Sequence, residues 1–428
     1  MKVGVVADDI TGANDIGSMF ASGGYLTHVY TSDTFDPAEL GRPHPDVCIV
    51  DTNSRLDPPR VAYDKVYAAT RQLQEAGCEH FFNKTCSVFR GNIGPELDAM
   101  LDALGETLAI VVLGFPKNGR VTRDGIHYVH GLRLEDSHFR NDPIHPATGS
   151  NLVELLQSQT KRTCGLVTHD VVSAGVAAVQ ARLAELRERC QYIIFDVLDQ
   201  AALATIARAV VGCRVFAGSS ALAEELPTVW GGGRDHADPG VLPPQDGKGA
   251  LCVAGSLTPQ TAAQIEFLQA QGLPVVELDT LRIFDPAGRT KEIERIVAPL
   301  VDYLTAGRHA VVHAANQPSL VERTQTEGER RGLHRAEVGR LVGETLAEIV
   351  VRTSRYTGLR RMVIAGGETS EAICRRLGIH GMRVWKEIQP GVPSCVSLQD
   401  QPLLLVLKSG SFGTPDFLEQ ALAHVQVQ

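Results

Sequence analysis

The sequence has no apolar run long enough to cross a lipid bilayer. A transmembrane helix needs roughly 18 or more consecutive apolar residues, whereas the first apolar run, 2–7, is followed at once by two aspartates. That run also lacks the length and flanks of a targeting segment. The nine cysteines are an odd number without a Cys-x-x-Cys pair, which favours reduced thiols over a disulfide framework. We therefore expect a soluble, cytoplasmic protein with no membrane partner.

Several widespread catalytic and nucleotide-binding motifs are missing as well. The absence of G-x-x-x-x-G-K-[ST] excludes a P-loop protein, and neither H-E-x-x-H nor G-x-S-x-G occurs. No G-x-G-x-x-G follows the first strand-like run, which argues against the usual nicotinamide-binding fold. The net charge of −9 argues against nucleic acid as a partner.

What is present is the pattern of an α/β protein. A hydrophobic content of 43% and a charged content of 21% are ordinary for a soluble globular chain, and 428 residues are enough for two or three domains. Strand-like runs alternate with helical patterns, which predicts mostly parallel sheets with flanking helices. In the first half the predicted strands are 2–7, 26–30, 47–51, 80–83, 108–113, 164–168, 192–196 and 214–217, with helices at 59–75, 94–104, 151–159 and 174–189.

A linker signal divides the chain. Residues 231–249 contain six glycines and three prolines among nineteen residues, which is typical of a domain boundary. The alternation then resumes, with predicted strands at 250–254, 275–278, 310–314, 362–365 and 403–407, and helices from 259, within 335–353 and from 370. We expect two α/β domains, 1–230 and 250–428, with the active site in the cleft between them.

The most informative segment follows the first predicted strand. It places Asp8 and Asp9 directly after the strand, with Asp15 a few residues further on. Ligands of open α/β sheets bind beyond the carboxyl ends of the strands, so these acids stand where chemistry is expected. The alternative is that Asp9 or Thr11 only caps a helix.

Two further polar segments follow strands of the first domain. Arg55 comes shortly after the strand 47–51 and offers a fork of donors suited to a carboxylate or phosphate, although a surface salt bridge is the alternative. Lys84 begins a segment with two hydroxyls that ends at Arg90 and Gly91. Cys86 in that segment is interpreted as a packed or substrate-contacting thiol, because no sequence feature indicates a base that would make it a nucleophile.

Histidines cluster further along the same domain. His127, His130 and His145 follow a loop at 114–120, but their spacing matches no zinc pattern. We expect hydrogen-bonded structural histidines rather than a metal site.

In the second domain three glycine-containing turns follow predicted strands. They contain Gly255 and Ser256, then Gly366 to Ser370, then Lys408 to Gly413. Thr258 and Pro259 are expected at the N-cap and first position of a helix. Glycines at such junctions let backbone N–H groups approach phosphate, so three of them favour a nucleotide site, with purely structural turns as the alternative.

These segments resemble the four-carbon acid sugar kinases. The resemblance rests on ADDITGAND at 7–15, K-x-x-S-x-x-R-G-N at 84–92, GR…DG.HYV.G at 119–131, GGETS at 366–370 and PGVP…LKSGSFG at 390–413. It covers nearly the whole chain in the right order. Such kinases have an N-terminal substrate domain and a C-terminal nucleotide domain, and they phosphorylate a terminal hydroxyl of threonate, erythronate or an oxo-tetronate with ATP.

The resemblance implies roles for particular residues. Substrate contacts are implied for Asp9, Arg55, Lys84, Thr85, Cys86 and Ser87, and ATP contacts for Ser256, Gly366, Gly367, Glu368, Thr369 and Gly410. One common family form is K-x-D-S-T-x-R-G, from which Cys86 and Val88 depart; another branch has Cys before the Ser. The departure leaves the acid sugar open rather than the reaction.

The expected mechanism is in-line phosphoryl transfer. Arg55 and Lys84 would hold the substrate carboxylate, and Asp9 would orient the attacking hydroxyl and accept its proton, with Asp8 or Asp15 as alternative bases. Mg²⁺ would accompany ATP and keep most of its waters. The rival interpretations are an NAD-dependent hydroxy-acid dehydrogenase and a non-catalytic sugar-acid sensor. The sequence leaves the oligomeric state open, a homo-oligomer included.

Overall fold

A computed structural model describes residues 2–40, 44–142, 145–232, 242–244 and 247–426. The chain folds into two compact units, Met1–Ala237 and Asp238–Gln428, called unit 1 and unit 2 below. Most of the predicted linker, 233–241 and 245–246, lies outside the described residues. Among the described helices, none combines the length and the apolar character that crossing a membrane requires.

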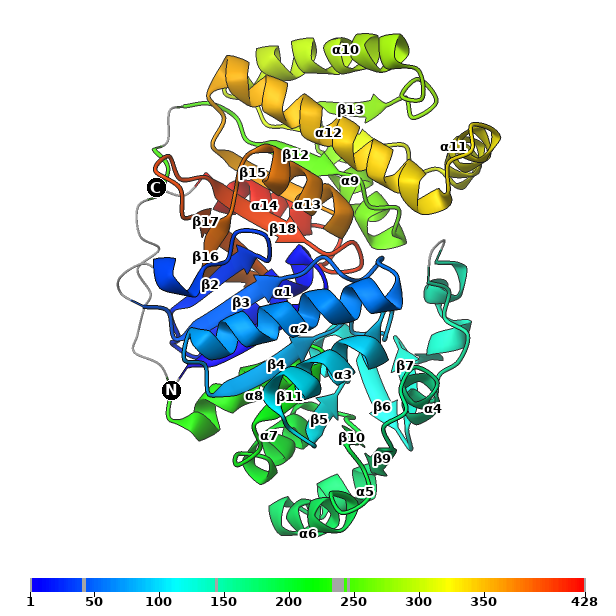
Figure 1. The fold of residues 1–428 in the computed structure, drawn as a ribbon. Coiled ribbons are helices and arrows are strands. Elements are labelled where there is room, and N and C mark those ends of the chain that lie inside the picture. Colours follow the sequence, from blue (N-terminus) through cyan, green and yellow to red (C-terminus); the bar gives the residue numbers. More distant parts are fainter. Residues whose placement is uncertain (1, 41–43, 143–144, 233–241, 245–246, 427–428) are drawn as a thin grey trace. The chain divides into compact units, whose positions relative to one another are not determined.

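Unit 1 is built on a parallel sheet (Figure 1). Its strands lie in the order β2-β3-β1-β4-β11-β5-β10-β9. Their bounds are β1 Val3–Ala7, β2 Thr27–Thr31, β3 Val47–Asp51, β4 His80–Lys84, β5 Ala109–Val112, β9 Cys164–Val167, β10 Tyr192–Phe195 and β11 Val215–Gly218. The register pairs Ala7 of β1 with Asp51 of β3 and with Lys84 of β4. The segments that follow these three strands therefore leave the sheet at the same edge.

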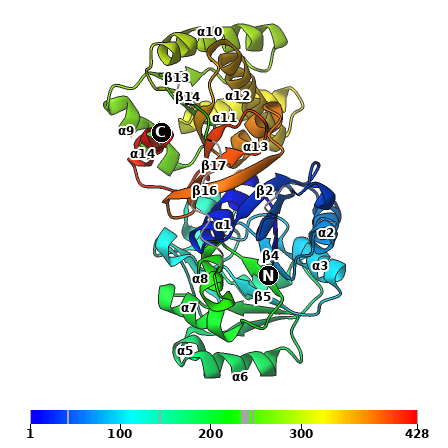
Figure 2. The same cartoon turned by 90° about the vertical axis from the view of Figure 1, so that its left-hand side faces the viewer.

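Helices cover both faces of this sheet, with α2 and α3 on one side and α1 and α8 on the other (Figure 2). Ala62, Val66, Ala69 and Leu73 of α2 recur at helical spacing, and all four are buried. The helices of unit 1 are α1 Ile10–Ser22, α2 Pro59–Glu75, α3 Ile93–Leu104, α4 Leu152–Gln157, α5 His169–Ser173, α6 Val176–Leu186, α7 Gln200–Ala209 and α8 Ala221–Trp230, with 3₁₀ turns at Pro37–Glu39, Pro116–Asn118, Leu134–Asp136 and His138–Asn141.

A small antiparallel sheet completes unit 1. It consists of β6 Arg120–Arg123, β7 Ile126–Val129 and β8 Leu132–Arg133. None of these short strands was expected from the sequence, because each has at most four residues and is rich in polar side chains.

Unit 2 also contains a mostly parallel sheet, in the order β13-β14-β12-β15-β18-β17-β16. The strands are β12 Leu251–Ala254, β13 Val275–Leu278, β14 Ala310–Ala314, β15 Arg361–Ala365, β16 Gly381–Gln389, β17 Val392–Ser397 and β18 Leu404–Lys408. Within this sheet the described antiparallel pairings are β16–β17 and β17–β18. The register pairs Ala365 with both Ala254 and Lys408, so β12, β15 and β18 end level with one another.

The helices of unit 2 lie on both faces of its sheet (Figure 2). They are α9 Pro259–Ala270, α10 Pro286–Thr305, α11 Pro318–Arg330, α12 Arg335–Thr357, α13 Gly367–Arg376 and α14 Phe417–His424. The expected cap is confirmed: Thr258 caps α9 by accepting from the Thr261 N–H, and Pro259 occupies its first turn.

The predicted α/β class with two mostly parallel sheets is confirmed, and several boundaries differ. The helix expected from Ser370 begins at Gly367, because Gly366 adopts the turn that leads directly out of β15. The helix expected over 174–189 is shorter, Val176–Leu186, because Gly175 at φ +98° separates it from α5. The antiparallel pair β16–β17 was not expected, since its sequence lacks a short turn signal of Asn-Gly type.

Candidate functional site

The ends of β1, β3 and β4 bring three of the predicted segments together. Asp8 and Asp9 follow β1, Arg55 follows β3, and Lys84 is the last residue of β4. Backbone hydrogen bonds join these segments: the Thr52 N–H donates to the Ala7 carbonyl at 2.9 Å and the Arg55 N–H to the Asp8 carbonyl at 3.3 Å. The acids and cations therefore share one sheet edge, as the parallel register requires.

Arg55 forms a buried ion pair with both aspartates. Its Nε and Nη2 donate to the two carboxylate oxygens of Asp8 at 2.9 and 2.7 Å, and its Nη1 donates to Asp9. The Asp8 side chain is 1% exposed and that of Arg55 is 15% exposed, so this is not the surface salt bridge considered as an alternative. Burial opposes the charge of Arg55, yet the two carboxylates raise its pKa well above the ordinary value. Arg55 is therefore neutralised by Asp8 and Asp9, the two aspartates that follow β1.

Asp9 has two structural roles at once. It caps α1, accepting from the Gly12 N–H at 2.6 Å and from the Thr11 hydroxyl at 3.2 Å. Burial opposes ionisation of Asp9, but Arg55 and Lys84 outweigh it and hold the pKa of the carboxyl below its usual range. Capping and a functional role are compatible here, because one carboxylate oxygen is directed to the helix and the other to Arg55.

Lys84 and Asp15 form a second buried pair. The Lys84 Nζ lies 3.3 Å from an Asp15 carboxylate oxygen and donates to the Thr85 carbonyl at 3.1 Å. The Ser220 hydroxyl donates to the other Asp15 oxygen at 2.7 Å. Both side chains of the pair are 5% exposed or less, so their charges depend on one another.

The loop after β4 carries a third cation. Arg90 donates from Nε to the Cys86 sulfur at 3.3 Å and from Nη1 to Asp142 at 2.6 Å, and Phe89 before it has φ +54°. Such a left-handed backbone is uncommon for a bulky residue and recurs at functional sites. Burial would raise the pKa of the Cys86 thiol, but Arg90 and Arg55 together lower it. Cys86 is therefore a polarised thiol between two arginines.

The neighbouring hydroxyls are placed differently. Thr85 is wholly buried, and its hydroxyl donates to the Cys86 carbonyl at 3.3 Å. Ser87 is half-buried, and its carbonyl is 3.0 Å from His127 Nε2. Ser87 is the more accessible of the two predicted contacts.

His127 hydrogen-bonds to the loop that follows β4. Its Nδ1 lies 3.0 Å from the Thr122 hydroxyl and its Nε2 faces the Ser87 carbonyl. Burial, with a smaller effect of Arg120, lowers the pKa of His127 to about 3, so the neutral ring donates from Nε2 and accepts at Nδ1. The expectation of a hydrogen-bonded structural histidine is confirmed at this position. Residues 143–144, beside His145, lie outside the described residues.

The sequence reasoning missed two buried charged side chains near the site. Arg120 is 1% exposed, and burial lowers its pKa to about 10. Glu96 of α3 is 1% exposed and accepts from the Ser54 hydroxyl at 2.7 Å. A glutamate in the first turn of a predicted helix is ordinarily explained by the favourable interaction of negative charge with the helix N-terminus. Only its position on the buried face of α3 could have indicated that Glu96 is buried. Within the described residues no three His, Cys, Asp or Glu side chains form a metal-binding group.

Glu96 should make the stability of the protein pH-dependent. Burial, assisted by Asp8, raises its pKa well above the ordinary value. The unfolded chain therefore loses this proton at lower pH than the folded protein, and folding loses stability as the pH rises above about 4.3. We expect Glu96→Gln to become more stable than wild type by up to about 1.4 kcal/mol per pH unit over that range.

Urea unfolding at pH 5, 6, 7 and 8 measures this difference. The exposed Glu154→Gln, on α4 of the same unit, is the control and should keep a constant offset from wild type. A Glu96→Gln offset that is independent of pH would show that Glu96 ionises normally in the folded protein.

In unit 2 the three predicted glycine turns also meet. The Gly255 and Ser256 N–H groups both donate to the Ala365 carbonyl at the end of β15, at 3.1 and 3.3 Å. The Gly366 N–H donates to the Lys408 carbonyl at the end of β18, at 2.9 Å. The turns after β12, β15 and β18 are therefore hydrogen-bonded to one another in series.

Two glycines are required by this arrangement. Gly366 has φ +122°, which a residue with a side chain rarely adopts. A Cβ at Gly410 would stand 2.3 Å from the Ser256 hydroxyl, closer than any real contact. The predicted ATP contacts Ser256, Gly366 and Gly410 thus lie within one small region.

The remaining predicted ATP contacts stand at the start of α13. Gly367 is its first residue, Glu368 is exposed in the first turn, and Thr369 is buried. The N-terminus of a helix of this length favours an anion. The Glu368 carboxylate adds negative charge there, so its predicted contact would suit a nucleotide hydroxyl or a hydrated cation better than a phosphate oxygen.

Lys408 was singled out in the sequence only as the start of a turn. In the structure it is fully buried at the end of β18. Its Nζ donates to Thr261, Ser409 and Gly410, and no carboxylate lies within ion-pair distance of it in the described parts of the chain.

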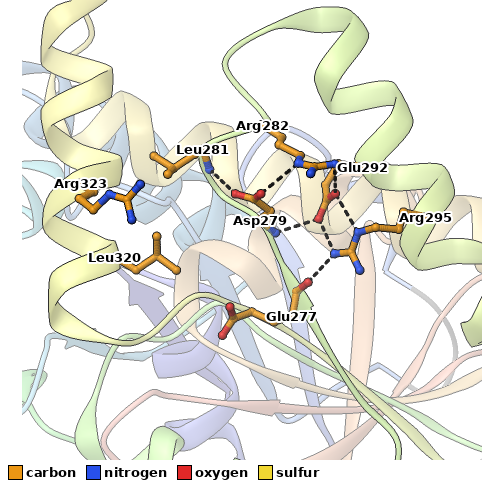
Figure 3. Close-up of a pocket in the computed structure, with 8 residues that line it drawn as sticks. All are labelled: Glu277, Asp279, Leu281, Arg282, Glu292, Arg295, Leu320 and Arg323. Carbon is orange, nitrogen blue, oxygen red and sulfur yellow. Dashed lines mark hydrogen bonds and ion pairs between the residues drawn. The ribbon is translucent and has the colours of Figure 1, made fainter.

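A separate pocket of about 450 Å³ opens at the end of β13 (Figure 3). It is lined by Glu277, Asp279, Leu281, Arg282, Glu292, Arg295, Leu320 and Arg323. Figure 3 shows that most of its charges pair with one another: Asp279 with Arg282 at 3.0 Å, and Glu292 with Arg295 at 2.5 Å. None of the predicted site residues is among those lining it.

Two family models match successive parts of the chain. Residues 3–226 match the family described as a sugar-binding N-terminal domain, and residues 251–418 match the nucleotide-binding C-terminal domain. The 3-oxo-tetronate kinase of Actinobacillus succinogenes is 33% identical over 98% of this chain and 99% of its own length. The 3-oxo-tetronate kinase of Burkholderia multivorans is 36% identical over 98% and 96%. A solved Haemophilus influenzae structure superposes with a TM-score of 0.72, at 29% identity over 99% of this chain and 100% of that one.

Proposed function

Because this chain belongs to the four-carbon acid sugar kinase family, we propose that it uses ATP to phosphorylate the terminal hydroxyl of a four-carbon acid sugar. The names of the relatives favour 3-oxo-tetronate over threonate or erythronate as the substrate. We assign the substrate to 1–230 and ATP to 250–428, with 231–249 as linker. The observation that carries the proposal is the convergence of Asp9, Arg55 and Lys84 at one sheet edge.

Asp9 acts on the attacking hydroxyl in this proposal. The substrate oxygen bonds to the γ-phosphorus of ATP while the bond from phosphorus to the bridging oxygen breaks, and the hydroxyl proton passes to the Asp9 carboxylate. Asp9 stays ionised because Arg55 and Lys84 lower its pKa. A weakly basic carboxylate suffices, since phosphoryl transfer asks a protein mainly for positioning and charge neutralisation. Asp8 and Asp15 serve less well, because their side chains are 1% and 5% exposed whereas that of Asp9 is 14% exposed, although all three are ion-paired.

The substrate carboxylate needs a cation with donors to spare. Three of the five N–H donors of Arg55 bond to Asp8 and Asp9, so at most two remain for a ligand, and Lys84 pairs with Asp15. Among the described residues Arg90 bonds to Cys86 through Nε and to Asp142 through Nη1, which leaves its Nη2 for a ligand. We therefore add Arg90 to Arg55 and Lys84 as a carboxylate-binding residue, with Cys86 and Ser87 beside it.

The nucleotide is assigned to the turns of unit 2. Gly367, Thr369 and Gly410 would offer backbone N–H groups to the phosphates, and Ser256 and Thr369 would offer their hydroxyls. Gly366 would contribute by the absence of a side chain, because the Ser256 and Gly366 N–H groups already donate to Ala365 and Lys408. Mg²⁺ would enter with ATP, held by phosphate oxygens and water as this ion prefers, and would neutralise charge on the transferring group.

A coupled assay of ADP formation tests the proposal. The panel contains 3-oxo-tetronate, threonate and erythronate in both stereochemical series, with Mg²⁺ and ATP. Substrate-dependent turnover on at least one acid is expected. Thermal-shift titration adds a second readout: ATP or ADP should raise Tm, whereas NAD should not. No turnover on any acid, or stabilisation by NAD alone, would reject the kinase in favour of a sensor or a dehydrogenase.

Arg90 should control affinity for the acid. We expect Arg90→Met to raise KM for the acid sugar by about 10- to 100-fold, the value of a charge-assisted hydrogen bond of roughly 1.5–3 kcal/mol. KM for ATP should stay within twofold. Arg90→Lys should recover part of the affinity, since charge is kept but the fork is lost.

The control is Arg133→Met, an exposed arginine in β8 of the same unit. Steady-state kinetics in both substrates measures the effect. An equal rise in the two KM values, or none, would remove Arg90 from carboxylate binding.

A further inference from the structure

Lys408 is a buried cation without a buried anion. Its side chain is 0% exposed, and its Nζ donates to the Thr261 hydroxyl at 3.0 Å, the Ser409 carbonyl at 2.9 Å and the Gly410 carbonyl at 2.8 Å. All three partners are neutral. An ammonium group in such a place is costly unless negative charge is supplied, and no described carboxylate supplies it.

The contacts of Lys408 also orient the turn that follows β18. The Gly410 carbonyl accepts three hydrogen bonds, from Lys408 and from the hydroxyls of Thr258 and Thr261 at 2.6 and 2.9 Å. A trans peptide directs its carbonyl and the following N–H to opposite sides. Holding the carbonyls of Ser409 and Gly410 toward Lys408 therefore turns the next two N–H groups the other way. Successive N–H groups on one side of a turn form an anion-binding concavity.

We propose that Lys408 is a positioning residue that holds this turn for the nucleotide phosphates, and that those phosphates supply the charge its buried ammonium lacks, so that nucleotide binding is coupled to protonation of Lys408. The inference rests on the proposed function, because it requires the nucleotide at these turns. Its supporting observation is independent of any sequence likeness: a fully buried lysine bonded only to neutral groups at the meeting point of three turns.

The ionisation of Lys408 is consistent with this role. Burial lowers its pKa to about 7, with Cys252 of β12 acting weakly in the opposite direction. Burial raises the pKa of the Cys252 thiol to about 12 and that of Cys395 on β17 as well, so neither thiol titrates near neutrality. Glu368 and Glu371 on α13, which contacts β18, lie beyond ion-pair distance of Lys408 Nζ.

The coupling to Lys408 gives the nucleotide affinity a pH dependence. Bound phosphate favours the charged lysine, so the nucleotide complex holds a proton that the free protein loses above about pH 7. Affinity should therefore fall as the pH rises, by up to tenfold per pH unit above that point.

The test measures binding of ADP with Mg²⁺ by isothermal titration calorimetry from pH 6.5 to 8.5. For wild type we expect Kd to rise by about 10- to 30-fold over this range. At pH 8, titrations in two buffers of different ionisation enthalpy should show uptake of close to one proton. Lys408→Arg remains charged throughout, so it should bind with much less pH dependence and less proton uptake. This comparison also cancels the titration of ADP itself.

Lys408→Met removes the charge and should bind at pH 6.5 no better than wild type does at pH 8.5. Lys291→Met, an exposed lysine on α10, is the control and should retain the wild-type pH profile. Thermal unfolding checks that each variant is folded. If the variants do not fold, the proton uptake of wild type on binding ADP tests the proposal by itself.

Tight binding of ADP without proton uptake or pH dependence in wild type would overturn the role of Lys408 and leave the kinase proposal intact. Absence of ADP binding at every pH, together with no substrate-dependent turnover, would overturn both. These two failures are therefore distinguishable in one set of measurements.

Discussion

Asp9→Asn should lower kcat by about 10²- to 10⁴-fold, the usual contribution of a positioned general base. Asparagine has the same shape as aspartate and is an equally good N-cap, so it can still accept from the Gly12 N–H that Asp9 caps. The substitution removes the charge and the ability to take the proton. KM for ATP should change little, because Asp9 lies in unit 1.

A matched control is available for the cap. Asp199 caps α7 in the same way, accepting from the Ala202 N–H at 2.8 Å. Asp199→Asn should leave kcat within twofold, and its unfolding free energy gives the cost of the cap change alone. A kcat for Asp9→Asn within tenfold of wild type would transfer the role of base to Asp8 or Asp15, whose Asn variants complete the set.

The pH profile gives an additional readout of Asp9. Because Arg55 and Lys84 lower its pKa, the carboxylate is ionised at every pH above the ordinary aspartate value of about 3.9. We therefore expect no fall of kcat that is due to Asp9 between pH 5 and pH 7.

The sequence could predict that the candidate residues of unit 1 lie together, because a parallel sheet aligns the ends of its strands. The strands ending at Ala7, Asp51 and Lys84 were recognisable as apolar runs, and a parallel register aligns their ends. The same reasoning located the turns after β12, β15 and β18. The sequence could not show which charged side chains pair with one another when they are far apart in the chain. Arg55 was expected to hold a substrate, yet it bonds to Asp8, 47 positions away, because burial forces each charge to find a partner.

Arg90 and Lys408 show a second limit of what can be predicted from the sequence. Arg90 was visible in its motif, but only the geometry shows that all three nitrogens of Arg55 bond to carboxylates, whereas Nη2 of Arg90 bonds to no described residue. Lys408 ends an apolar strand, where a lysine normally extends into solvent. Its complete burial depends on Thr261 and Gly410, which are far away in sequence. Periodicity predicts which face of an element is buried, and it cannot reveal an enclosed charge.

Arg55→Met should be the most destabilising single substitution in the site, by about 3–5 kcal/mol. It leaves Asp8, 1% exposed, and Asp9 without their cation. The matched control is Arg60→Met. Arg60 also pairs with an aspartate, Asp64 at 3.0 Å, but the side chains are 80% and 55% exposed. Loss of that surface pair should cost less than about 1 kcal/mol. Chemical denaturation at pH 7 measures both.

Two results would separate loss of charge balance from loss of packing. Adding Asp8→Asn to Arg55→Met should restore part of the stability, because one of the unpaired buried charges is removed. The deficit of Arg55→Met should also shrink as the pH falls from 7 to 4. In the variant, Arg55 no longer opposes the effect of burial on Asp9, so this carboxyl takes up a proton at higher pH than in wild type, and the unpaired charge is relieved as the pH falls. A deficit equal to that of Arg60→Met, or one that is independent of both pH and Asp8, would mean that the site does not depend on this ion pair for its structure.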